Sequence, residues 1–170
     1  MINDLLEYSR VSSAKRQFQR VSIESVIQET LTNLKIPIEE SNAIVTHDPL
    51  PHVYGDKNLL VQLFQNLISN SIKYKGTGTP QIHINAVKET ENYVFSVKDN
   101  GIGISTKNLD SIFTIFHRLH SNDEFDGTGI GLSIVKKIVH EHGGEIWVES
   151  EPDVGTEFFF TIPIILDEMS

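Results

Sequence analysis

Three polar side chains recur at helical spacing in one segment of the sequence, namely Asn66, Asn70 and Lys73. At about 100° per residue they fall within about 60° of one another on a helix, well away from the apolar residues of the segment. An amide oxygen suits a hard cation, and an ammonium group suits a phosphate. The segment therefore fits either a solvated helix face or part of a cation and phosphate site. The tract Ser69-Asn70-Ser71 is unusual in mid-helix, because Asn is a mediocre helix former.

A carboxylate followed by two glycines forms a second candidate, Asp99-Asn100-Gly101-Ile102-Gly103-Ile104. It comes directly after residues 93–97, which alternate as a strand does. Glycines let the backbone come close to a ligand. A carboxylate at the end of a strand can accept a hydrogen bond from an exocyclic amine, such as that of adenine. By itself the segment is equally consistent with a plain turn from strand to loop.

Two further glycine segments stand nearer the C-terminus. Gly127-Thr128-Gly129-Ile130-Gly131-Leu132 opens a predicted helix, where backbone N–H groups and the helix dipole favour phosphate. Polar residues 123–126 precede it instead of a strand, which excludes a Rossmann fingerprint, and the chain contains no G-x-x-x-x-G-K-[ST] P-loop motif. Gly155-Thr156, before the last strand, is by itself simply a turn.

Strands and helices alternate along the chain and must position these segments. Alternation and short apolar runs predict strands over residues 19–23, 44–47, 81–87, 93–97, 145–149 and 156–162. Helical periodicity predicts helices over residues 24–42, 56–74, 106–116 and 129–142. The order favours an α+β fold, a two-layer α/β sandwich in which three helices cover one face of a mixed sheet.

The boundaries of these elements depend on a few residues. Pro37 is expected to disturb or end the first helix, Asp56 to cap the second, and Gly143-Gly144 to stop the last. Residues 48–55 contain two prolines and a glycine and are predicted to form a loop. The tract His140-Glu141-His142 is interpreted as a surface helix end rather than a metal site, since residues two apart point to different sides of a helix.

Composition limits the classes of function. The chain has 170 residues, no cysteine, 39% hydrophobic and 22% charged residues, and a formal net charge of −9. These values suit one globular domain, exclude a disulfide framework or a zinc–thiolate site, and make nucleic acid and anionic lipid poor partners. The lack of cysteine suits a reducing cytoplasm, where we expect this domain to lie without direct contact with a membrane.

In this order the four segments resemble the boxes of the sensor histidine kinase catalytic domain. This domain is a member of the ATPase superfamily that includes type II topoisomerases, heat-shock chaperones and mismatch-repair proteins. The helix with Asn70 resembles the N box, residues 99–103 the first glycine box and residues 112–116 the F box. Residues 127–132 resemble the second glycine box, and Gly155-Thr156 the family's ending. The resemblance implies a Bergerat-type fold that binds ATP and Mg²⁺ and transfers the γ-phosphoryl group to a histidine.

The resemblance also implies a role for each matching residue. Asp99 would accept from the adenine amine, Asn70 would hold Mg²⁺ against the phosphates, and Asn66 would support that region. Arg118 would reach the terminal phosphate, so that Asn66 and Arg118 are the implied catalytic residues. Residues 117–127 would form a lid over the nucleotide. The implied nucleotide-binding set is Asn66, Asn70, Lys73, Tyr74, Asp99, Gly101, Gly103, Ile104, Gly127, Thr128, Gly129, Gly131, Leu132 and Thr156.

One position separates the branches of this superfamily. The hydrolysing branches have a glutamate one turn before the metal asparagine, and this chain has Asn66 there. An amide cannot take a proton near neutral pH, so the site lacks that general base. Phosphoryl transfer to an outside nucleophile needs mainly positioning and charge stabilisation, and the sequence therefore favours a kinase over a hydrolase.

None of the seven histidines stands in the family's phosphoacceptor setting, so the chain resembles a catalytic fragment without its own substrate. Residues 1–18 would be the end of a dimerisation-hairpin helix and a linker, residues 19–166 the catalytic domain, and residues 167–170 a tail. The implied partners are the hairpin of a full-length, homodimeric kinase and a response regulator. Two alternatives stay open: a serine/threonine kinase of the anti-sigma-factor type, and a nucleotide-binding module that only docks partners.

Overall fold

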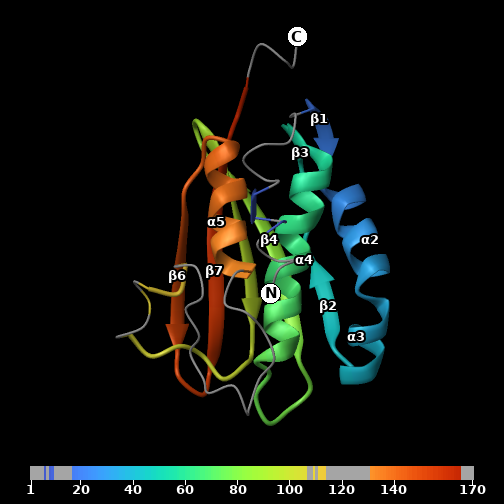
Figure 1. Ribbon diagram of the computed structural model, residues 1–170, viewed down its shortest axis with the longest axis vertical. Coiled ribbons are helices and arrows are strands. Elements are labelled where there is room, and N and C mark those ends of the chain that lie inside the picture. Colours follow the sequence, from blue (N-terminus) through green and yellow to red (C-terminus); the bar gives the residue numbers. More distant parts are fainter. Residues whose placement is uncertain are drawn as a thin grey trace.

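The computed structural model describes Leu6, Tyr8, Ser9 and residues 17–106, 109, 111–113 and 131–165. Its strands are β1 (Phe18–Ser22), β2 (Ile44–His47), β3 (His52–Asp56), β4 (Gln81–Lys88), β5 (Asn92–Asp99), β6 (Ile146–Glu151) and β7 (Gly155–Pro163). Its helices are α2 (Ile23–Asn33), α3 (Lys35–Ser41), α4 (Lys57–Lys73) and α5 (Gly131–Glu141). The helices form one layer and the large sheet the other, which confirms the predicted two-layer α+β fold (Figure 1).

A five-stranded sheet makes up one layer, in the order β2–β4–β5–β7–β6, and a separate two-stranded sheet pairs β1 with β3. β2 runs parallel to β4 and the other neighbours are antiparallel, so the sheet is mixed, as predicted. In the β5–β7 pair Asp99 stands opposite Thr156. This register brings two of the predicted site segments together.

Three phenylalanines join the helical layer to the sheet. Phe64 of α4 packs edge-on against Phe95 of β5 and Phe160 of β7, with ring centroids 6.2 and 5.5 Å apart, and the two sheet rings stack at 5.1 Å. All three side chains are fully buried. Burial of each ring stabilises the fold by about 1.5–3 kcal/mol, so the cluster fixes α4, which carries the asparagines, over β5.

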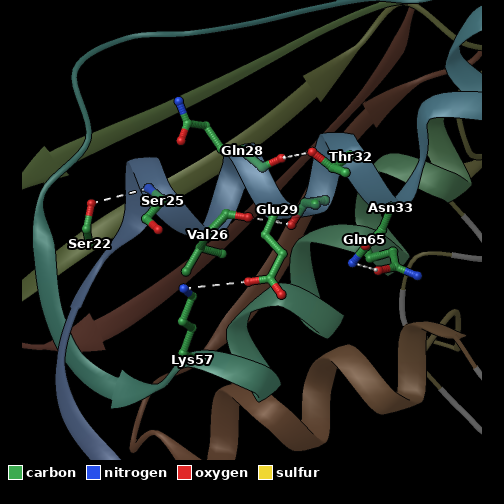
Figure 2. Close-up of polar contacts among 10 residues, drawn as sticks. Ser22, Ser25, Val26, Gln28, Glu29, Thr32, Asn33, Lys57 and Gln65 are labelled. Carbon is green, nitrogen blue, oxygen red and sulfur yellow. Dashed lines mark hydrogen bonds and ion pairs between the residues drawn. The ribbon is translucent and has the colours of Figure 1, made fainter.

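α2 packs along α4 on the side away from α5 (Figure 1). Figure 2 shows two polar contacts between these helices: Glu29 pairs with Lys57 at 3.7 Å, and Asn33 donates to Gln65 at 3.3 Å. Both contacts are exposed, and an exposed ion pair contributes only about 0–1 kcal/mol. The buried apolar residues of α2 and α4 therefore hold the two helices together.

The helix predicted over residues 24–42 is two helices, because the chain breaks at Leu34, which ends α2 and precedes α3. Pro37 is the third residue of α3, where a missing N–H costs no bond within the helix. In a continuous helix its ring would clash with the carbonyl group of Asn33, four residues earlier. Pro37 thus disturbs the helix as expected, but the break lies upstream of it.

The prediction of a loop over residues 48–55 is wrong from His52 onward, where β3 pairs antiparallel with β1. Both prolines lie before the strand, so they remove no hydrogen bond from this ladder. Gly55 stands inside the strand because a Cβ there would lie 2.9 Å from the ring of His142. A contact with a residue so far along the chain leaves no signal in the local sequence.

His142 is buried, which corrects the interpretation of its segment as a surface helix end, although His140 is exposed. Nδ1 of His142 donates to the carbonyl oxygen of Ile138 at 2.8 Å, and Nε2 accepts from the N–H of Asp56 at 3.1 Å. Asp56 also caps α4 as predicted, since its Oδ1 accepts from the N–H of Leu59 at 3.2 Å. These bonds tie the start of α4 to the end of α5.

The helix predicted over residues 106–116 lies partly outside the described residues. The described ones, 106, 109 and 111–113, form short turns instead of an α-helix. Ile112 is buried, and Phe113 packs edge-on against Phe158 of β7 at 6.2 Å between centroids. Packing on the sheet therefore fixes this segment. Among the described residues, no helix has both the length and the apolar character of a membrane span.

Candidate functional site

A pocket of about 390 Å³, open to solvent, lies where four parts of the chain meet: the end of α4, the loop after β5, the start of α5 and the start of β7. Its lining contains seven residues of the predicted set, namely Asn70, Tyr74, Asp99, Gly103, Ile104, Leu132 and Thr156. Ile102 and Phe158 complete the lining. The fold thus gathers residues from separate segments of the sequence, as their pattern predicts.

Three donors hold the Asp99 carboxylate in the wall of the pocket. Oδ1 accepts from the N–H of Gly101 at 2.8 Å and from the N–H of Thr156 at 3.2 Å, and Oδ2 accepts from the hydroxyl of Ser71 at 2.8 Å. Strand pairing produces the arrangement, because Asp99 ends β5 opposite Thr156. The carboxylate is therefore oriented from both the helical layer and the sheet.

Burial raises the pKa of the Asp99 carboxyl above its ordinary value of 3.8, and the hydrogen bonds from Gly101, Ser71 and Thr156 act in the opposite direction. In its ionised form this side chain is an acceptor only. It can take a hydrogen bond from an amine, whereas a carbonyl oxygen at the same place would be repelled. The carboxylate is therefore suited to a ligand group that donates a hydrogen bond, such as an amine.

Two glycines in the loop after β5 are needed for close backbone approach. A Cβ on Gly103, whose φ is +74°, would lie 2.2 Å from the carbonyl oxygen of Glu151. A Cβ on Gly101 would lie 2.5 Å from the carbonyl oxygen of Tyr74, which also accepts from the N–H of Ile102 at 3.0 Å. The loop is therefore held between the end of α4 and the end of β6, in a space that admits no side chain at either glycine.

Ser150 of β6 connects this loop to β7. Its hydroxyl accepts from the N–H of Ile104 at 2.7 Å, donates to the carbonyl oxygen of Gly155 at 2.9 Å, and lies 2.9 Å from the hydroxyl of Thr156. Thr156 is buried and its N–H bonds Asp99. The family resemblance implies that Thr156 belongs to the nucleotide-binding set, and the structure puts it in direct contact with Asp99.

The two asparagines and Lys73 occupy the C-terminal half of α4. Asn70 lines the pocket, while Asn66, one turn earlier, and Lys73 are half-buried. The amide nitrogen of Asn66 is buried and has no hydrogen-bond partner within the described part of the chain. A buried donor without a partner is costly, so this group is suited to meet a water or a ligand oxygen.

These amides fit a Mg²⁺ ion that is held mainly by a nucleotide. Mg²⁺ prefers oxygen ligands, keeps several waters, and usually takes one or two ligands from protein with phosphate oxygens completing its shell. The amide of Asn70 offers one such oxygen at the pocket. Within the described ranges, no group of three or more His, Cys, Asp or Glu side chains could hold a metal ion. A Mg²⁺ ion at Asn70 would take its other ligands from phosphate oxygens and water.

Part of the predicted set lies outside the described residues: Arg118, Gly127, Thr128, Gly129 and the lid over 117–127. The first two residues of α5, Gly131 and Leu132, are described. Leu132 lines the pocket, and a Cβ on Gly131 would meet no atom of the described residues within 4 Å.

Sequence reasoning missed four residues that shape the site: Ser71, Ile102, Ser150 and Phe158. Ser71 carried a signal, because it is polar at a helix position that continues the buried stripe of Leu60, Leu63, Phe64, Leu67 and Ile68. Ile102 is an apolar residue within the first glycine segment and Phe158 lies two residues after Thr156, and only the fold shows that they face the pocket.

Solved structures share this architecture. The catalytic domain of histidine kinase ThkA, in a nucleotide-free form, matches with a TM-score of 0.73 and 27% identity over 89% of this chain and 99% of that chain. Full-length ShkA in complex with AMPPNP matches with a TM-score of 0.80 and 26% identity over 95% of this chain and 35% of that chain. The family model for histidine kinase-, DNA gyrase B- and HSP90-like ATPases matches residues 55–165. The chain belongs to this family.

Within the family, the chain is an ATP-binding catalytic domain of the sensor histidine kinase type, as its sequence motifs predict. Cyanobacterial phytochrome A of Nostoc sp. strain PCC 7120 is 49% identical over 164 residues, which cover 96% of this chain and 21% of the phytochrome. The chain thus spans about a fifth of the length of that relative.

Proposed function

We propose that this kinase domain binds ATP with Mg²⁺ and transfers the γ-phosphoryl group to a histidine of a dimerisation hairpin, which passes it to an aspartate of a response regulator. The observation that carries the proposal is the Asp99 carboxylate, held by three donors in a pocket that it shares with Asn70. The carboxylate suits the adenine amine, and the amide suits the phosphate end of the same ligand.

Different side chains of the pocket are assigned to different parts of the nucleotide. Asp99 would bind the amine of the base, and Tyr74 and Ile102, which line the same pocket, would pack against the apolar faces of the base. Asn70 would supply a ligand oxygen to Mg²⁺, which when bound neutralises charge on the phosphates. Asn66 would donate its amide N–H, which has no partner among the described residues, to a phosphate oxygen or a water. The remaining parts of the proposed set are Lys73 and Arg118 on phosphate, with Gly127, Thr128, Gly129 and Gly131 near the phosphates.

The amide of Asn66 favours transfer over hydrolysis. A hydrolase needs a base to activate water, and an amide cannot accept a proton near neutral pH. Phosphoryl transfer depends instead on bringing a nucleophile into line with the γ-phosphorus, which positioned binding supplies. In that step an imidazole nitrogen forms the N–P bond, the bond between the γ-phosphorus and the β,γ-bridging oxygen breaks, and ADP leaves.

The proposed acceptor lies on a hairpin and not among the seven histidines of this chain. We assign residues 1–18 to the end of a hairpin helix and a linker, and residues 19–166 to the catalytic domain. In a homodimeric kinase the hairpin would present its histidine to this pocket. The requirement for ATP suits a cytoplasmic location of the domain.

The test is phosphoryl transfer with γ-labelled ATP and Mg²⁺, in the presence and absence of the phosphoacceptor hairpin of the full-length kinase. We expect acid-labile label on the hairpin histidine, none on a hairpin whose histidine is replaced by glutamine, and none on this chain alone. Rapid release of inorganic phosphate by the chain alone would place it with the hydrolysing branch. Acid-labile label on the chain itself would show that one of its own histidines is an acceptor.

A further inference from the structure

Ser71 is a polar residue on the buried face of α4, with only 3% of its surface exposed. Its hydroxyl lies 2.8 Å from Oδ2 of Asp99 and 3.2 Å from the carbonyl oxygen of Leu67, one turn earlier in the helix. A hydroxyl has one proton to donate. The shorter contact is to a charged acceptor, where hydrogen bonds are stronger, so the proton belongs mainly to Asp99.

The lone pairs of the Asp99 carboxylate show what this bond leaves available. Each carboxylate oxygen offers two acceptor positions. Both positions on Oδ1 are taken, by the N–H groups of Gly101 and Thr156. Oδ2 has one position taken by Ser71 and one left. Among the described contacts, an incoming base therefore finds a single open acceptor position, because Ser71 occupies the other position on Oδ2.

We propose that Ser71 is a positioning residue that sets the base selectivity of the nucleotide pocket, by occupying one lone pair of Oδ2 of Asp99 so that only the second faces the base. This proposal rests on the proposed binding of an adenine nucleotide. With Ser71 in place the carboxylate presents an acceptor alone, which accepts from the amine of adenine and repels the carbonyl oxygen of guanine.

Loss of the hydroxyl would weaken this selection in two ways. Oδ2 would have two open acceptor positions in place of one, so the amine of the base would no longer be directed to a single position. The bond also favours the ionised form against the effect of burial, so its loss would move the pKa of Asp99 further upward. A protonated carboxyl carries an O–H donor, and this donor could bind the carbonyl oxygen of guanine.

A purely structural role of Ser71 leads to a different expectation. Its contact with the carbonyl oxygen of Leu67 is a bond that serine makes within many helices, and alanine is a better helix former. If Ser71 only filled space in α4, alanine would leave nucleotide affinity and its pH dependence unchanged. The pH dependence of base selectivity therefore separates the two roles.

The experiment measures dissociation constants for ATP and GTP by calorimetry from pH 5 to pH 8, for the whole chain and for Ser71→Ala, Ser71→Thr and Ser69→Ala. Ser69→Ala is the matched control, because Ser69 lies two residues earlier in the same helix and makes no described bond to Asp99. For Ser71→Ala we expect ATP affinity to fall about threefold to tenfold at pH 8, and the ratio of ATP to GTP affinity to decline at a higher pH than in the unmodified chain. Ser71→Thr, which keeps the hydroxyl, should restore the profile. An unchanged pH profile for Ser71→Ala would overturn the inference alone, whereas absence of ATP binding by the unmodified chain would overturn the proposed function as well.

Discussion

Replacing Asp99 by asparagine exchanges one oxygen of the pocket for an amide nitrogen and removes the charge. The N–H groups of Gly101 and Thr156 converge on Oδ1 at 2.8 and 3.2 Å, so the remaining oxygen of the amide must stay there. The new NH₂ group then takes the place of Oδ2, beside the hydroxyl of Ser71. The hydroxyl can turn to accept from it, and we therefore expect the fold to be retained.

The substitution should weaken ATP binding, because the adenine amine would face a donor in place of a charged acceptor. A hydrogen bond to a charged group contributes about 1.5–3 kcal/mol, which corresponds to a loss of ATP affinity of about 10-fold to 150-fold. The same NH₂ group can donate to the carbonyl oxygen of guanine. Asp99→Asn should therefore lower the ratio of ATP to GTP affinity as well as the affinity for ATP.

The assay is calorimetric titration of the variant with ATP and with GTP at pH 8, together with thermal unfolding to verify the fold. Asp48→Asn is a matched control, because Asp48 makes the same change of charge at an exposed position, where its carboxylate pairs with His83. The control should bind ATP like the unmodified chain. An Asp99→Asn variant with unchanged ATP affinity, or with an unchanged preference for adenine, would refute the assignment of Asp99 to the base.

Three further predictions follow from the same geometry. Asn70→Ala should weaken ATP binding in the presence of Mg²⁺ more than in its absence, and equal losses in the two titrations would show that Asn70 only shapes the pocket. Gly103→Ala should lower the free energy of unfolding, measured by chemical denaturation, by about 1–3 kcal/mol or more. The reason is that φ of Gly103 is +74° and a Cβ there would lie 2.2 Å from the carbonyl oxygen of Glu151. A loss below about 0.5 kcal/mol, the scale of ordinary surface substitutions, would contradict this close approach. Because the pKa of Asp99 is raised in the folded state, the ionised carboxylate lowers stability at high pH and this cost disappears as pH falls through that pKa toward 3.8. Without nucleotide, the melting temperature of Asp99→Asn minus that of the unmodified chain should therefore be highest near pH 8 and should decline on acidification. A difference that grows on acidification would contradict the raised pKa of Asp99.

The sequence carries enough local information to locate most of the site. Asp99 follows an alternating strand, and the helix that bears Asn70 begins at a residue, Asp56, whose side chain caps it as predicted. The alternation of strands and helices predicts a mixed sheet in a two-layer fold, but it does not determine the strand order β2–β4–β5–β7–β6. The register that sets Asp99 opposite Thr156 is a consequence of pairing two strands whose buried faces were visible in the sequence.

The parts that sequence reasoning missed depend on contacts between distant residues. Gly55 is a turn signal by itself, and only the ring of His142 against it explains a glycine within a strand. The hydroxyl of Ser71 belongs to the site only because the last residue of β5, Asp99, places its carboxylate against it. The break at Leu34 has a local cause instead, since Pro37 acts on the turn before it, and the local pattern misplaced this break by a few residues.

The most direct test of the central claim is a calorimetric titration of the chain with ATP, with and without Mg²⁺. A pocket built from Asp99 and Asn70 should bind one ATP per chain, bind GTP more weakly, and bind ATP more tightly when Mg²⁺ is present. Binding that does not distinguish ATP from GTP, or no binding of ATP under either condition, would contradict the account.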